Sequence, residues 1–117
     1  MIYPQEIEVW YVLPLIRKEL SKELLNHNLN QKEIALKLGL TEAAVSQYLN
    51  EKRANERIFD KGLKNAVIEA ARRIKDNRNV MKEIQNLSRL FWKTKDICKI
   101  HMQHDKSIPK TCEICFK

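Results

Sequence analysis

The chain has 117 residues, of which 44% are hydrophobic, 7% are aromatic and only two are glycine. This length allows one domain, or a small domain with an appendage, and so few glycines and aromatic residues argue against a β-sandwich or barrel. The net charge of +7 favours a polyanionic partner. The charge is uneven, because residues 1–56 carry 7 basic and 8 acidic side chains (−1), whereas residues 57–117 carry 15 and 7 (+8).

Targeting segments are not evident in the sequence. No apolar run approaches the roughly 18 residues of a membrane span, and the longest, Val9 to Ile16, is interrupted by Pro14. The N-terminus lacks a basic segment followed by an apolar core, so no secretion signal is expected. We therefore expect a cytoplasmic protein without a membrane partner.

The first predicted elements lie at the N-terminus. Residues 1–13 mix apolar and acidic side chains, which predicts a short helix or an extended arm. Pro14 suits the first turn of a helix. Because Ile16, Leu20 and Leu24 recur at a spacing of four, we expect a helix over about 14–26.

Residues 31–50, QKEIALKLGLTEAAVSQYLN, predict two short amphipathic helices joined by a tight turn at Gly39. Glycine can adopt the left-handed conformation that ends a helix. Asn30 can cap the first helix, with Glu33 completing a capping box, and Thr41 can cap the second. The pattern indicates a helix-turn-helix, whose second helix lies in the major groove of DNA. Apolar residues stand where two steeply crossing helices must touch: Ile34, Ala35, Leu38, Leu40, Val45 and Leu49.

Polar residues on the outward face of the second helix are short or amide side chains, which suit base edges and phosphates. Gln47 is the strongest candidate for contacting adenine, because an amide can pair with both N6 and N7. Lys52 and Arg53 follow the helix and could clamp a phosphate. The alternative is a helix pair that only builds a core.

This segment resembles the helix-turn-helix of the phage-repressor class of regulators. The resemblance implies that Gln31 opens the supporting helix near a phosphate. It also implies that the following residues face the groove: Thr41, Glu42, Ala43, Ser46, Gln47 and Asn50.

Two longer helices are expected after this segment. An apolar stripe with steps of three and four predicts a helix over about 57–76, and residues 77–79 predict a break. A second helix begins near Val80 and ends anywhere from Trp92 to Met102. The pair can pack on the N-terminal helices, pair with a second chain, or do both.

All three cysteines lie in the last 20 residues, as Cys98-x2-His101 and, after a gap of ten residues, Cys112-x2-Cys115. Two such pairs suit tetrahedral zinc, and a metal would supply the folding energy that a short polar tail lacks. His104 is the alternative histidine ligand. If no histidine binds, three cysteines favour an iron–sulfur cluster with an exchangeable position. Unrelated cysteines in a frayed tail are the remaining alternative.

As a whole, the chain resembles small predicted archaeal transcriptional regulators that join a repressor-type (XRE-type) helix-turn-helix to a C-terminal cysteine cluster. The resemblance rests on Leu13-Pro14 with Arg17, on the segment ALKLGLTEAAVSQYL, and on the terminal cysteines. It implies a dimeric transcription factor of the cytoplasm that binds double-stranded DNA.

We therefore expect an all-α protein with three parts: a helix-turn-helix DNA-binding domain (1–55), a helical dimerisation or support region (56–95) and a cysteine-rich metal-binding tail (96–117). One alternative is a helical adaptor whose zinc knuckle binds RNA or a protein partner. An enzyme using Cys98 as nucleophile and His101 as base is disfavoured, because the sequence has no glycine-rich phosphate loop and no paired carboxylates in an apolar setting. No small-molecule substrate is evident.

Overall fold

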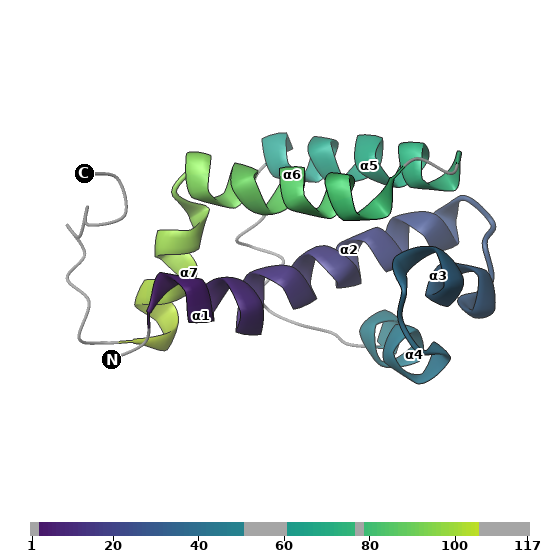
Figure 1. The fold of residues 1–117 in the computed structure, drawn as a ribbon, viewed down its shortest axis with the longest axis horizontal. Helices are drawn as coiled ribbons and strands as arrows, with labels where there is room; N and C mark the ends of the chain where they lie inside the picture. Colours follow the sequence, from purple (N-terminus) through teal and green to yellow (C-terminus); the bar gives the residue numbers. More distant parts are fainter. Residues whose placement is uncertain (1–2, 51–60, 77–78, 106–117) are drawn as a thin grey trace.

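The computed structural model describes residues 3–50, 61–76 and 79–105 (Figure 1). Within these ranges every regular element is helical, which confirms the predicted all-α class. The elements are α1 (Pro4–Ile7), η1 (Glu8–Val12), α2 (Leu13–Asn26), α3 (Gln31–Leu38), α4 (Glu42–Asn50), α5 (Lys61–Lys75), α6 (Val80–Lys93) and α7 (Asp96–His104). None of these helices is long and apolar enough to cross a membrane.

The first three elements form one continuous helix with a π-helical segment, η1, in its middle. Residues at both junctions have right-handed helical backbone angles, and the Leu13 N–H donates to the Glu8 carbonyl in the wide π pattern. Pro14 follows directly. A proline inside a helix lacks an N–H, and its ring clashes with the carbonyl four residues earlier. The wider π-helical turn of η1 opens the helix next to Pro14. The predicted helix over 14–26 is therefore present, but it extends upstream into residues 4–12.

This long helix is the axis of the molecule. The α5 and α6 helices pack along α2 on one side, and α3 and α4 pack on its C-terminal half (Figure 1). At the opposite end, α7 packs on α1, η1 and α6. One cluster of buried apolar side chains runs through all these elements and includes Ile16, Leu20, Val45, Val67 and Phe91. The helices expected after residue 50 therefore pack on the N-terminal helices.

The boundaries of the later helices are set by local hydrogen bonds. Asn79 caps α6 by accepting from the Lys82 N–H at 3.1 Å. At the other end, Lys95 adopts a left-handed conformation with φ 65° and separates α6 from α7. The second long helix thus ends at Lys93, and residues 96–104 form a helix of their own. The predicted start of α5 near residue 57 lies outside the described residues.

Candidate nucleic-acid interface and metal ligands

The α3–α4 helix pair is fixed by the local interactions that its sequence predicts. Asn30 Oδ1 accepts from the Glu33 N–H at 2.8 Å, and Glu33 Oε1 accepts from the Asn30 N–H at 3.2 Å, which completes the capping box. Gly39 adopts the left-handed conformation with φ 67° and ends α3. Thr41 Oγ1 accepts from the Ala44 N–H at 3.1 Å and caps α4. Both helix starts and the turn between them are therefore stabilised locally.

The inner side of the helix pair belongs to the core of the protein. Ile34 and Val45 are fully buried, and Ala35 and Leu38 are nearly so. Leu40 and Leu49 are partly buried and pack against the same cluster. Both α3 and α4 also contact α2, so the pair packs on the central helix. The six apolar residues expected between the helices are therefore buried or partly buried.

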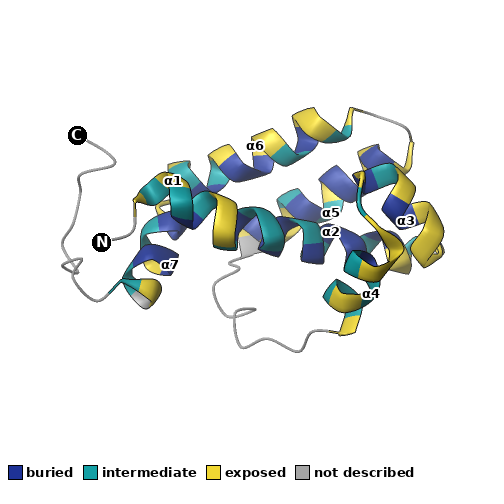
Figure 2. Ribbon diagram, turned by 60° about the horizontal axis from the view of Figure 1, so that its bottom comes forward, coloured by how far each residue is buried: buried dark blue, intermediate teal, exposed yellow. Residues whose placement is uncertain are grey.

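The outer side of the pair carries the candidate DNA-contacting residues. Figure 2 shows exposed segments on both α3 and α4. The exposed candidates are Gln31, Thr41, Glu42, Ala43, Gln47 and Asn50, whereas Ser46 is half-buried. Asn50 Nδ2 donates to Ser46 Oγ across one turn of α4 at 3.5 Å. The Thr41 hydroxyl uses a lone pair as the cap and keeps its O–H for another acceptor. Lys52 and Arg53 lie outside the described residues.

The helix pair itself has little net charge. Within residues 31–50, Lys32 and Lys37 are balanced by Glu33 and Glu42. Phosphate neutralisation supplies much of the affinity of DNA-binding proteins. Tight binding by this surface therefore requires basic groups from elsewhere, or two copies acting together.

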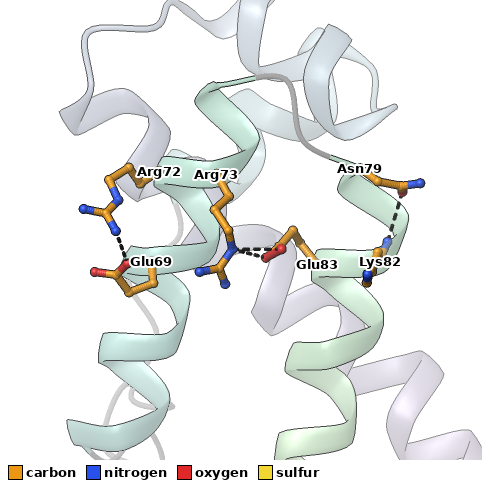
Figure 3. Close-up of polar contacts among 6 residues, drawn as sticks. All are labelled: Glu69, Arg72, Arg73, Asn79, Lys82 and Glu83. Atoms are coloured by element: carbon orange, nitrogen blue, oxygen red, sulfur yellow. Dashed lines mark hydrogen bonds and ion pairs between the residues drawn. The ribbon is translucent and has the colours of Figure 1, made fainter.

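The corner between α5 and α6 lies at the same end of the molecule as α3 (Figures 1 and 2). An open groove of about 660 Å³ is lined there by Arg72, Arg73, Lys82 and two acidic residues. Arg73 Nε donates to both carboxylate oxygens of Glu83 at 2.9 Å, which links α5 to α6 (Figure 3). These hydrogen bonds raise the pKa of Arg73 above its ordinary value.

The first half of the predicted metal site lies on α7. Cys98 and His101 are separated by one turn of this helix, with Cys98 half-buried and His101 buried. His101 Nε2 lies 3.9 Å from Asp105 Oδ2. Cys112 and Cys115 lie outside the described residues. Among the residues that the structure places, no three His, Cys, Asp or Glu side chains come together in a way that could hold a metal.

His104 faces a different environment from His101. Its ring stacks on Tyr11 of η1, with ring centroids 3.7 Å apart and an angle of 9° between the planes. Sequence reasoning missed Tyr11 and Asp105 as neighbours of the two histidines. Tyr11 is 93 residues away along the chain, and only the packing of α7 on η1 brings it close.

Comparison with protein-family models, curated proteins and solved structures finds no match for this chain. The functional argument therefore depends on the surfaces and residues themselves.

Proposed function

We propose that this protein is a sequence-specific, DNA-binding transcriptional regulator that acts as a homodimer and holds a metal at its C-terminal cysteines. The observation that carries the proposal is the α3–α4 pair, whose capped helices bury one side and expose short polar and amide side chains on the other. A pair that only built a core would have no need of short polar and amide side chains at Thr41, Gln47 and Asn50 on its exposed side.

In this proposal the polar candidates have separate roles. Gln47, exposed on α4, contacts adenine through both ends of its amide. Thr41 donates its O–H to a phosphate, and Gln31 at the first turn of α3 contacts a second one. Asn50 and Ser46 act together, because their side chains are hydrogen-bonded. Lys52 and Arg53 supply phosphate contacts next to the groove.

The weak charge of the α3–α4 surface supports dimerisation. Each helix pair carries no net charge over residues 31–50, so the phosphate contacts of one copy are few. Two copies on one DNA molecule add their contacts, because binding of the second becomes intramolecular. The basic excess of residues 57–117, which carry 15 basic and 7 acidic side chains, supplies further attraction to the DNA backbone.

The C-terminal ligands in this proposal are Cys98, His101, Cys112 and Cys115, which suit zinc, with an iron–sulfur cluster as the alternative cofactor. The contact between His101 and Asp105 supports His101, because a carboxylate beside the imidazole orients a ligating histidine. The stacking of His104 on Tyr11 assigns His104 a packing role.

DNA recognition is tested with the variant Gln47→Ala. We expect binding to the preferred site to weaken by about 1–3 kcal/mol, or roughly tenfold to a hundredfold, because the amide pair with adenine is lost. Salt-dependent binding to random duplexes should be unchanged. The matched control is Gln5→Ala, which removes an exposed amide from α1. Competition titrations on selected and random duplexes measure both quantities.

If site preference survives both Gln47→Ala and Ser46→Ala, α4 does not read the groove. Preferential binding of RNA over duplex DNA in the same titrations would instead favour the alternative function, a helical adaptor that binds RNA through a zinc knuckle.

Metal binding is tested by elemental analysis of protein purified with and without oxygen. We expect Cys112→Ser, Cys115→Ser and His101→Gln to lose the metal, because each removes one ligand. His104→Gln is the matched control and should keep it. A brown protein indicates an iron–sulfur cluster and a colourless zinc-containing protein indicates zinc. Metal-free wild-type protein contradicts the assignment.

A further inference from the structure

A groove separates the N-terminal part of the long helix from α6. Its walls come from η1, the start of α2 and the outer side of α6, and its volume is about 440 Å³. This size is within the range of about 300–1,000 Å³ that is usual for small-molecule sites. Leu13, Ile84 and Met81 form an apolar wall, and Met81 leaves 76% of its surface exposed at the rim.

Two polar side chains of the groove, Glu8 and Ser88, are already paired with each other. Glu8 Oε2 accepts from Ser88 Oγ at 2.7 Å and from the Trp92 indole Nε1 at 2.5 Å. These bonds join η1 to α6 across about 80 residues of sequence, as their separations of 80 and 84 show. The Glu8 carboxylate therefore has a structural role.

Two guanidinium groups at the groove have no such partners. Arg17 on α2 and Arg89 on α6 both line it. Neither guanidinium forms a hydrogen bond or ion pair with any residue in the described part of the chain. With Glu8 as the one carboxylate among the lining residues, two positive charges face one negative charge. The groove therefore favours a ligand with a single negative charge.

We propose that this groove is a binding site for a small amphipathic carboxylate, whose apolar part lies on Leu13, Met81 and Ile84. Its carboxylate is held between Arg17 and Arg89. Guanidinium groups form strong charge-assisted bonds with carboxylates, and an apolar wall with a few placed polar groups is typical of small-molecule sites. The Arg17 and Arg89 guanidinium groups need no macromolecular partner, because the carboxylate of one small ligand pairs with both.

The position of the groove suggests what such a ligand would do. Arg17 lies on α2, and α2 also packs against α3 and α4. This consequence rests on the proposed function: a ligand that draws α2 toward α6 alters how the helix pair is presented to DNA. The carboxylate would then be the effector of the regulator.

Binding can be measured by the fluorescence of Trp92, because its indole is bonded to Glu8 in the groove wall. The chain has two tryptophans, so the variant Trp10→Phe leaves Trp92 as the sole reporter. Octanoate is the probe, with octanol and octylamine as neutral and cationic comparisons. We expect a saturable change with octanoate only. Arg17→Gln and Arg89→Gln should each weaken binding by about tenfold or more, through loss of a charge-assisted bond.

The matched control is Lys93→Gln, which removes an exposed cation of α6 that does not line the groove. Circular dichroism shows that each variant retains its helices. The site is overturned if octanoate gives no saturable change below its micelle concentration, if octylamine binds equally well, or if the arginine variants bind as wild type. It is also overturned if these variants dissociate a dimer, because the groove would then be covered by a second copy.

The coupling to DNA is tested separately, by titrating duplex DNA with and without saturating octanoate. An unchanged DNA affinity overturns the effector role. The octanoate site can be tested even if the protein does not bind DNA, because Trp92 reports on octanoate binding in the absence of DNA. A failure of the proposed function can therefore be told apart from a failure of the site.

Discussion

Lys18 is a basic residue in a buried position, whereas lysine side chains usually lie in water. It lies on α2 with 1% of its surface exposed, and its Nζ has no hydrogen-bond partner in the described part of the chain. Lysine is rarely fully buried unless it is paired. A buried, unsatisfied polar group costs about 1–3 kcal/mol, and a charged group costs more. The remaining interactions of α2 must offset this cost.

We therefore expect Lys18→Met, which keeps a long flexible side chain without the amine, to raise the free energy of unfolding by about 1–3 kcal/mol. Urea denaturation followed by circular dichroism measures the change. Lys64→Met is the matched control on an exposed site of α5 and should leave the stability nearly unchanged. A loss of stability in Lys18→Met would mean that the ammonium group has a partner such as a buried water or an anion.

Two ion pairs involve arginines of α5, and we expect them to contribute unequally to the packing of α5 on α6. The Arg73–Glu83 pair joins the two helices, and the carboxylate is only 10% exposed. The Arg72–Glu69 pair lies within α5, and both side chains are about half exposed or more. Exposed ion pairs contribute little, because water screens them and ordering the side chains costs entropy. The Arg73–Glu83 pair, which joins the two helices, should therefore contribute more to stability than the Arg72–Glu69 pair (Figure 3).

We expect Glu83→Gln to lower the free energy of unfolding by about 1 kcal/mol, a value reduced to allow for the half-exposed arginine. Glu69→Gln should change it by less than about 0.5 kcal/mol. Thermal and urea denaturation of the two variants compare them directly. Equal effects would show that the link between α5 and α6 contributes nothing beyond an ordinary surface pair.

Under the proposed function, the shape of the whole molecule restricts how two copies could be arranged on DNA. Its longest dimension is 43 Å and the others are 22 and 23 Å, with α3 and α4 at one end and α1 and α7 at the other (Figure 1). Adjacent half-sites on one face of DNA lie about 34 Å apart. Contact through the α1–α7 end would place the helix pairs much farther apart than this. If two copies contact each other through a long side of the molecule, or near α3, their helix pairs can lie at the required spacing.

We therefore expect a palindromic site whose half-site centres are about 10–10.5 base pairs apart. Hydroxyl-radical footprinting of the protein on a selected duplex measures this spacing. Half-sites separated by two or more turns would indicate contact through the α1–α7 end, and a single unpaired half-site would indicate that a monomer binds.

Several features of the protein could be predicted from sequence because they depend on residues close together in the chain. Asn30 and Glu33 form their capping box within one turn. Gly39 takes a left-handed conformation that most residues resist. The apolar spacing of α3 and α4 identifies which side is buried. The predicted DNA-contacting residues follow from the same local pattern, so their exposure was predictable, while DNA binding itself stays a prediction.

Which distant residues meet depends on tertiary packing. The sequence alone indicated the helices over residues 14–26 and 31–50, the caps at Asn30 and Thr41 and the apolar side of the α3–α4 pair, because helical periodicity and capping are local. It did not indicate that Glu8 would bond to Ser88 and Trp92, or that Arg17 and Arg89 would line one groove. Those contacts depend on how α6 packs against η1 and α2, and that packing is chosen by the whole core rather than by any one segment.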